Sequence, residues 1–378
     1  GEASPSLQPP RALRALRGLP LPPLRGPPPQ RPRLSLTTDC LSLILELIRL
    51  ATGYLMIPHQ GGLFFYTPRH GGDMAVKVPY TKQSLSIPDQ VALLQSRGVH
   101  VPDQQEAEHF LRYHNYYQVS GYVYYFEVKD QTRTHRTHQL ARPISFNDLI
   151  SLVHFDQELR HIFFRMTTEI EIALRCSVAY RLSQAYGPFC FEHKDIFRTP
   201  EQNKKNNKFK EILQKACAAH EKEPFVAHFT QTYQESIPPA WVMVELLTLG
   251  NISWLYSQLK TDLQKDIAQD FSIDHSILVS WLKALTELRN TCAHHMRLWN
   301  KVFVNHPKIR KADQSFPIRQ VNRLGSFLPM VFHLMHILHN NQKYQTEFLQ
   351  LLRTQPLIKP RDMGLSRWPE EQTWIPKK

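Results

Sequence analysis

Apolar residues recur every three or four positions along one stretch that follows Ser145 and ends near Gly187. This spacing places the apolar side chains on one face of a helix. The stretch therefore predicts one long helix or two helices in tandem. The apolar face consists of Phe146, Leu149, Ile150, Val153, Leu159, Ile162, Phe163, Met166, Ile170 and Leu174.

Shorter stretches also carry helical spacing and helix-end signals. Ser86 can cap a helix that has Pro88 in its first turn and ends at Gly98. Strands and helices do not alternate, and no repeat of fixed period appears. We therefore expect a mainly α fold, a helical bundle with a small irregular or β appendage. The other predicted helices cover residues 103–113, 238–250, 252–259, 274–288, 318–339 and 345–353.

Two segments depart from this helical pattern. Residues 116–126 are aromatic and favour β structure by composition, and either a strand pair or a packed loop fits them. Residues 204–210 are basic and rich in asparagine, which predicts an exposed loop. Trp241 and Trp254 are expected in the core, because large aromatic side chains are mostly buried.

The first 73 residues differ in composition from the rest. They contain no lysine, whereas twenty lysines occur from Lys77 onward, and they hold twelve of the 28 prolines. Because proline lacks an amide donor, residues 1–35 are predicted to be disordered, and the apolar residues 41–57 could form a surface helix. Ordinary helix signals begin only after Met74, as if the upstream residues came from an over-extended reading frame. We expect a folded domain over residues 74–354 and a C-terminal tail over 355–378.

Charge and cysteine content indicate the kind of partner and the cellular location of the chain. The 46 Lys and Arg against 33 Asp and Glu give a net charge of +13, which favours polyanionic partners such as RNA. The five cysteines are widely spaced, so neither a disulfide framework nor a zinc site is indicated, and a reducing, cytoplasmic location is expected. The apolar residues 41–57 are too short for the roughly 20 residues that span a bilayer, so no membrane contact is expected.

Residues 289–295 read Arg-Asn-Thr-Cys-Ala-His-His and end the helix predicted from Asp274. Residues four apart in a helix lie about 40° apart around its axis, so Asn290 and His294 share a face with Arg289 beside them. A histidine can accept a proton from a ribose 2′-hydroxyl near neutral pH, and an arginine can hold a phosphate as negative charge develops. Asn290 can orient His294 or bind a phosphate oxygen. This chemistry needs no metal or cofactor and yields a 2′,3′-cyclic phosphate.

Spacing alone also fits a simpler interpretation of these residues. An arginine and two histidines at an exposed helix terminus are common, and a protonated histidine is stabilised there by the helix dipole. The simpler interpretation is favoured until other parts of the chain are considered.

Further segments, in the same order along the chain, make the pattern more specific. Together with residues 288–300 (LRNTCAHHMRLWN) they resemble the bacterial abortive-infection family, Abi-like proteins of the AbiD and AbiF type, over about residues 80–340. These segments are Asn115-Tyr116-Tyr117 with Ser120-Gly121-Tyr122, Phe155-Asp156-Gln157-Glu158-Leu159-Arg160, Glu169-Ile170-Glu171 with Arg175, and Trp241 with Glu245 and Gly250.

The resemblance carries expectations about function. The family is regarded as a branch of the HEPN superfamily, which is marked by an arginine, often followed by Asn, and a histidine separated from the arginine by four to six residues. Arg289, Asn290 and His294 match this pattern, and His295 fits it one residue later. The resemblance implies a HEPN-like helical bundle. It also implies an RNA-cutting or RNA-binding effector of phage defence or a toxin, generally a homodimer, which an antitoxin or regulatory RNA could restrain. The leading hypothesis is a metal-independent endoribonuclease. The alternative is a non-catalytic RNA-binding or protein-interaction module on the same scaffold.

Other polar residues are weaker candidates. His333, His336 and His339 recur every three residues, but no Asp or Cys lies near them and no metal is assigned. Two i, i+4 ion pairs are expected, Asp156 with Arg160 and Glu171 with Arg175, and Glu169 is an auxiliary site candidate. The candidate RNA contacts are Lys204, Lys205, Lys208, Lys210 and Arg297.

Overall fold

The computed structural model describes residues 55–59, 62–66, 79–129, 136–198 and 202–369. The chain divides into two units, residues 1–83 and residues 84–378. In the first unit, β1 (Leu55–His59) pairs antiparallel with β2 (Gly62–Tyr66). The prediction for residues 1–35, and most of that for residues 41–57, falls outside the described residues; the end of the latter segment lies in β1.

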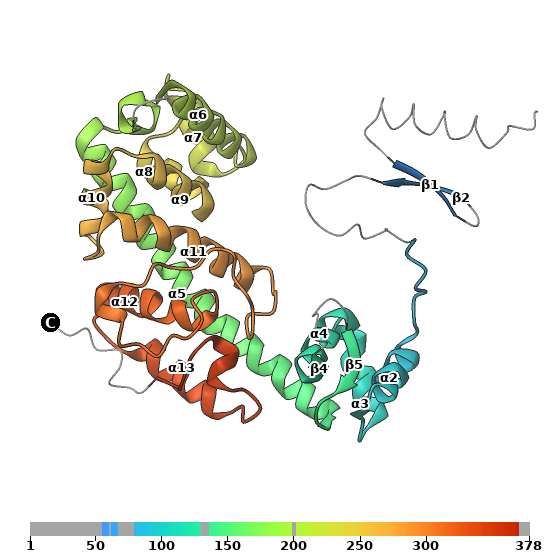
Figure 1. Cartoon of the computed structure of the whole chain (residues 1–378). Coiled ribbons are helices and arrows are strands. Elements are labelled where there is room, and N and C mark those ends of the chain that lie inside the picture. Colours follow the sequence, from blue (N-terminus) through green and yellow to red (C-terminus); the bar gives the residue numbers. More distant parts are fainter. Residues whose placement is uncertain (1–54, 60–61, 67–78, 130–135, 199–201, 370–378) are drawn as a thin grey trace, which may run out of the picture. The chain divides into compact units, whose positions relative to one another are not determined.

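The second unit is organised around one long helix, α5 (Phe146–Tyr186), drawn in green in Figure 1. Ser145 and Asp148 form a capping box at its start, and Gly187 ends it with a φ of +79°. The long stretch of helical spacing is thus one continuous helix. Its apolar face is buried along its length, from Phe146 to Leu182.

Two short helices precede α5 and follow the predicted boundaries. α2 (Ile87–Ser96) is capped by the Ser86 hydroxyl, and Gly98 follows it with a φ of +91°. α3 (Gln104–Tyr113) is capped by the side chain of Asp103. Between them, β3 (Val99–His100) pairs in parallel with β6 (Ile144–Ser145) at the start of α5.

The aromatic segment is a helix, α4 (Tyr116–Phe126), and the β or loop interpretation was wrong. Asn115 caps it by accepting a hydrogen bond from the Tyr117 amide at 2.8 Å. The buried side chains of α4 follow helical spacing and pack against the core, and this burial outweighs the β preference of aromatic residues. These buried apolar residues are Val119, Tyr122, Val123 and Phe126.

The β appendage is a small hairpin after α4. β4 (Glu127–Lys129) pairs antiparallel with β5 (Arg136–Leu140). Among the described residues, strands occur only as such two-stranded pairs, and twelve α-helices make up most of the fold. The expected mainly α fold with a small β appendage is confirmed.

The basic segment at residues 204–210 is also helical, which corrects the loop prediction. It belongs to α6 (Gln202–Ala219), where Asn206, Phe209 and Leu213 are buried three or four residues apart. Lysine is a good helix former, so the exposed lysines between these residues do not interrupt the helix. α7 (Pro224–Thr232) follows.

Gly250 does not end a helix, contrary to expectation. α8 (Ala240–Leu246) stops at Leu247, and α9 (Leu249–Gln258) starts with Thr248 as its cap in a capping box with Asn251. Gly250 therefore lies in the first turn of α9. The expected core position of Trp241 is wrong as well, because 55% of this residue is exposed, whereas Trp254 is partly buried.

The remaining helices complete the packing around α5. α10 (Thr261–Gln269) and α11 (His275–Ala293) cross α5. α12 (Leu328–His339) and α13 (Lys343–Arg353) pack against α5 nearer its N-terminal end than α10 does (Figure 1). α12 starts ten residues later than predicted, after the 3-10 turn η5 (Leu324–Phe327).

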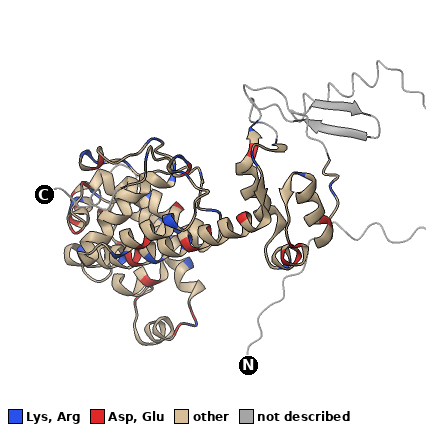
Figure 2. Ribbon diagram, turned by 90° about the horizontal axis from the view of Figure 1, so that it is seen from below, with Lys and Arg blue, Asp and Glu red and all other residues tan. Residues whose placement is uncertain are grey.

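The last described residues turn back onto this unit. They contain the 3-10 turn η6 (Pro360–Met363), in which Asp362 and Met363 are buried. Acidic and basic residues are spread along the helices of the folded part (Figure 2). Among the described residues, no helix combines the length and the apolar character that a membrane crossing requires.

Candidate functional site

The candidate motif lies at the C-terminal end of α11. Asp274 caps the start of this helix, and Leu278, Trp281, Leu285 and Leu288 bury one of its faces. Contacts along α5 show how α11 runs: Ser177 binds Asp270 before α11, and Asp156 binds Leu298 after it. The two helices are therefore antiparallel, and the motif reaches the middle of α5.

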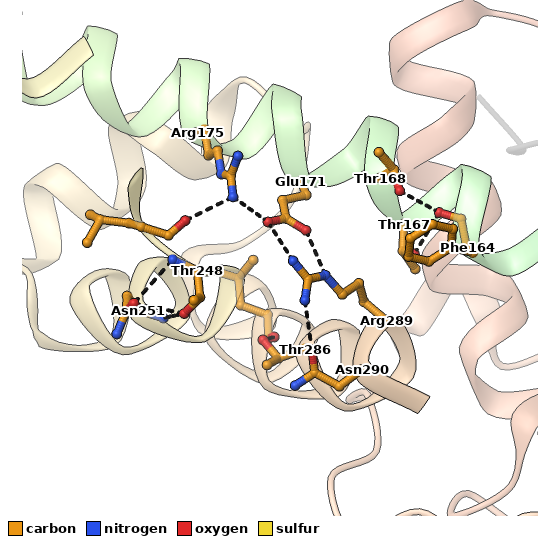
Figure 3. A network of polar contacts seen from close by, with 12 residues as sticks. Phe164, Thr167, Thr168, Glu171, Arg175, Thr248, Asn251, Thr286, Arg289 and Asn290 are labelled. Atoms are coloured by element: carbon orange, nitrogen blue, oxygen red, sulfur yellow. Dashed lines mark hydrogen bonds and ion pairs between the residues drawn. The ribbon is translucent and has the colours of Figure 1, made fainter. Parts of the chain in front are cut away.

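Arg289 is held by a carboxylate of α5 (Figure 3). Its Nε donates to Oε2 of Glu171 at 3.0 Å, and its Nη2 donates to Oε1 at 3.2 Å. Glu171 is 5% exposed, whereas 27% of the Arg289 side chain is exposed. This two-point contact fixes both the position and the plane of the guanidinium group.

Glu171 binds a second arginine in the same network (Figure 3). Arg175 donates to Oε1 of Glu171 at 2.6 Å, as expected for an i, i+4 pair, and to the carbonyl oxygen of Leu247 at 2.9 Å. Glu245 lies 3.7 Å from Arg175, but its side chain is 63% exposed and screened by water. Two guanidinium groups thus share one buried carboxylate, which leaves positive charge at the surface of the cluster.

Asn290 positions Arg289 rather than His294. Its Oδ1 accepts a hydrogen bond from Nη1 of Arg289 at 3.1 Å. Arginine has five N–H donors, and the contacts to Glu171 and Asn290 use three of them. One N–H on each terminal nitrogen of Arg289 remains for a ligand oxygen.

His294 and His295 form the end of α11. His294 is the C-cap residue, and His295 has a φ of +54° in the left-handed region. The His295 amide donates to the Cys292 carbonyl at 3.1 Å, and the Met296 amide donates to the Thr291 carbonyl at 3.1 Å, which is the Schellman pattern. Both histidines are exposed, and neither imidazole has a hydrogen bond or ion pair within the described residues.

The segment after the motif is anchored to α5 by Asp156. This buried carboxylate accepts hydrogen bonds from the backbone amides of Leu298 and Trp299, from the Tyr122 hydroxyl and from Arg160. Burial raises the pKa of Asp156, although Arg160 and these donors oppose the rise. The confirmed i, i+4 pair of Asp156 and Arg160 thus fixes the chain on the far side of His294.

Cys292 lies inside the motif, but it is not suited to act as a nucleophile. It is 4% exposed, and burial raises its pKa to about 12. The thiolate is the reactive form of cysteine, so Cys292 packs as a small apolar residue at neutral pH.

A family model described as Abi-like protein matches residues 109–300. The match starts within α3, ends just after Leu298 and Trp299, which Asp156 anchors, and covers half of the chain. The chain belongs to the Abi-like protein family. No curated protein and no solved structure matches the sequence.

The five candidate RNA contacts of this Abi-like protein do not form one cluster. Lys204, Lys205, Lys208 and Lys210 lie on α6, where Asn206 binds the Glu192 carbonyl just beyond the C-terminal end of α5. Arg297 donates to the carbonyl of Gly121, whose neighbour Tyr122 binds Asp156. Asp156 lies thirty residues before the end of α5. At 1.5 Å per residue of helix, the two groups are about 45 Å apart along α5.

Two of the three histidines of α12, His333 and His339, have partners of their own. Nε2 of His333 lies 2.9 Å from the Phe271 carbonyl oxygen, and His339 binds Glu169, which also accepts from the Tyr344 hydroxyl. The pKa of Glu169 is lowered, because these two hydrogen bonds outweigh the opposing effect of its burial. Glu169 therefore connects α5 to α12 and α13, away from Arg289. No group of three metal-ligating side chains occurs among the described residues.

Glu171 is the residue of this site whose role was missed in the sequence. It was expected to pair with Arg175 alone, yet it also orients Arg289. A signal was present, because Glu171 interrupts the apolar face that continues through Ile170 and Leu174. A buried carboxylate needs charged or hydrogen-bonding partners, and a helix packed against that face can supply one.

Proposed function

We propose that this Abi-like protein is a metal-independent endoribonuclease of abortive infection, of the HEPN kind, in which Arg289, Asn290 and His294 act on RNA. The main support is the guanidinium group of Arg289, which is oriented by Glu171 and Asn290 and still has free N–H donors. The exposed imidazole of His294 follows at the end of the same helix. The net charge of +13 favours a polyanionic substrate.

Each group has a defined role in the reaction. His294 accepts the proton of a ribose 2′-hydroxyl as its oxygen attacks the adjacent phosphorus. The bond from phosphorus to the 5′-oxygen breaks, and that oxygen takes a proton from a second imidazole, either His295 or a histidine of a second copy. Arg289 binds the non-bridging oxygens as negative charge develops on them. The products are a 2′,3′-cyclic phosphate and a 5′-hydroxyl.

The proposal includes a homodimer, because one copy of the motif supplies few groups on either side of the scissile phosphate. A row of exposed residues on α5 fits such an interface: Phe164, Thr168, Ile172, Cys176 and Tyr180 follow one another at intervals of four. Rows of this spacing pack against each other when two helices cross. Ile172 directly follows Glu171, so a twofold axis through this row would bring the two motifs near each other.

The decisive experiment incubates the purified full-length chain with RNA in EDTA. We expect fragments that end in 2′,3′-cyclic phosphate, and a loss of about a hundredfold or more in single-turnover rate for His294→Ala and for Arg289→Ala. His228→Ala is the matched control, because His228 is an exposed histidine on α7 and its loss leaves the rate unchanged.

The same assay distinguishes the proposed ribonuclease from the alternative, a non-catalytic binding module. RNA retention without cleavage by the wild-type chain would support a non-catalytic RNA-binding module on the same scaffold. Cleavage that needs a divalent metal, or that survives in His294→Ala, would contradict the proposed chemistry. A regulatory RNA or an antitoxin protein that binds the motif would suppress cleavage when added to the same assay.

A further inference from the structure

A basic cavity lies beside the segment that follows the motif. Its volume is about 900 Å³, and it is formed by α4 and β4, by Arg297 and Asn300, and by the two turns near residues 319–323 and 359–362. Seven of its sixteen lining residues are Lys or Arg, and two are acidic. This volume is typical of a small-molecule site.

Neither acidic residue of the cavity forms an ion pair with these cations. Glu127 is 3% exposed and is paired with Arg136, a residue outside the cavity lining. Asp362 accepts hydrogen bonds from the Tyr125 hydroxyl at 2.8 Å and from the Lys359 amide at 2.7 Å. Both carboxylates therefore serve the protein's own structure.

None of the seven cations forms an ion pair within the described residues, although Glu127 and Asp362 attract some of them from farther away. Arg297 donates to the Gly121 carbonyl and Arg323 donates to the Asn300 carbonyl at 2.8 Å, so both bind neutral oxygens. Burial lowers the pKa of Lys129 and of Arg323, and Arg297 lowers both further. Glu127 opposes this shift at Lys129 and Asp362 opposes it at Arg323, but neither reverses it. Arg142, Arg319, Lys359 and Arg361 are exposed, and no ion pair is formed by any of them.

The walls that carry these cations are held by backbone contacts. Gly364 has a φ of +77°, and a Cβ there would lie 2.5 Å from Cβ of Arg323. This close approach lets the amides of Arg319 and Gln320 donate to the Gly364 carbonyl at 2.8 and 3.0 Å. The two basic turns are thus fixed against each other before any ligand arrives, which lowers the entropic cost of binding.

Aromatic residues line the same cavity next to the cations. The ring of Tyr124 is partly exposed, with Nζ of Lys129 3.6 Å from its centre, and Arg142 lies 5.0 Å from the ring of Phe126. Aromatic rings and guanidinium planes stack on nucleobases, whereas Lys and Arg bind phosphates. Phe126 itself is buried, so the surfaces open to a base are the partly exposed Tyr124 ring and the exposed Arg142 guanidinium, while the other cations can bind the phosphates.

We propose that this cavity binds the phosphate groups of a nucleoside triphosphate, either as a free nucleotide or at the 5′ end of an RNA. The excess of unpaired cations fits a triphosphate better than a single phosphate. Only the RNA form of this ligand rests on the proposed ribonuclease function, because binding of a free nucleotide requires no cleavage.

Calorimetric titration of the full-length chain with ATP tests the proposal, with inorganic triphosphate as a second ligand. We expect saturable binding of ATP and a weaker affinity for inorganic triphosphate. Arg142→Gln combined with Arg319→Gln should raise the Kd about tenfold or more, since each removes a charged phosphate contact. Lys215→Gln combined with Lys222→Gln removes the same charge from exposed positions on and after α6 and should leave the Kd within about twofold.

A second arm compares RNAs that carry a 5′-triphosphate or a 5′-hydroxyl, in the His294→Ala background. Preference for the triphosphate RNA over ATP identifies the RNA end as the ligand, and equal binding of the two RNAs identifies the free nucleotide. Arg361→Gln serves as a second variant if the double variant does not fold. Absence of ATP and triphosphate-RNA binding at millimolar concentration, equal affinity for ATP and inorganic triphosphate, or equal losses in the two double variants would each overturn the proposal.

Discussion

Arg289 and Glu171 are 118 residues apart in the sequence and form a two-point ion pair between α11 and α5. The carboxylate is nearly buried, the guanidinium is partly exposed, and Arg175 shares the same carboxylate. The pair therefore links the position of the candidate motif to the packing of the two helices.

Removing the buried member of this cluster should cost more stability than removing Arg289. Glu171→Gln leaves two arginines without their carboxylate, and we expect a loss of about 3 kcal/mol in the free energy of unfolding. Arg289→Ala leaves Glu171 paired with Arg175, so a loss of about 1 to 2 kcal/mol is expected. Urea unfolding measures both values. The control Glu245→Gln, at a 63% exposed side chain, should change stability by under about 1 kcal/mol. Equal effects of all three substitutions would show that the cluster is not a stabilising centre.

His295 should respond to substitution through its backbone. A non-glycine residue in the left-handed region is disfavoured by roughly 1 kcal/mol, and glycine relieves this cost at the helix end. We expect His295→Gly to raise the free energy of unfolding by up to about 1 kcal/mol. His295→Ala should not raise it, because alanine keeps the strained backbone. Thermal unfolding compares the two variants, and a more stable alanine variant would contradict the assigned helix end.

Acid should destabilise the fold through His333. Burial, aided by Arg310, lowers the pKa of His333 to about 4, below the usual 6.5. Both the folded and the unfolded chain hold it neutral above pH 6.5. As the pH falls from 6.5 to 4, only the unfolded chain gains the proton, and stability drops by about 3 kcal/mol. Urea unfolding at pH 7, 6 and 5 should show this slope in the wild type. His333→Gln should reduce the slope, whereas His228→Gln should not; equal slopes in all three proteins would exclude this origin.

Much of the fold follows from local signals in the sequence. Ser86 caps the helix that it was expected to cap, and Asp103 and Ser145 cap helices that were predicted to start beside them, because capping depends on a few neighbouring residues. The errors arose where composition and spacing disagreed. In α4 and α6, aromatic or basic content concealed buried residues at helical intervals, and tertiary packing decided the outcome.

The site was only partly predictable for a different reason. Arg289, Asn290 and His294 are visible as a local motif, and the exposed histidines at the end of α11 agree with the expected helix. The contact of Arg289 with Glu171 joins two distant helices, and the basic cavity joins five separate segments. Such juxtapositions depend on tertiary packing, which no local spacing in the sequence reveals.

The last prediction concerns the homodimer and the exposed row on α5. Ile172 is 60% exposed at the centre of this row, and Phe164 and Tyr180 are 41% and 58% exposed. An unpaired charge at the centre of an interface costs several kcal/mol, so Ile172→Asp should shift the protein from dimer to monomer at micromolar concentration. The row is outside the core, so the Ile172→Asp monomer should still unfold cooperatively, at a melting temperature lowered only by the loss of the stabilisation that dimerisation gives.

The control for this substitution is Val304→Asp, which places the same charge at an 87% exposed apolar residue after α11. We expect this variant to remain a dimer in light scattering. If cleavage needs groups from both copies, Ile172→Asp should lose RNA cleavage although Arg289 and His294 are intact. Mixing two inactive proteins, Arg289→Ala and His294→Ala, should restore part of the activity through heterodimers. A wild-type chain that is monomeric and fully active, or an Ile172→Asp variant that remains dimeric, would rule out this row as the dimer interface.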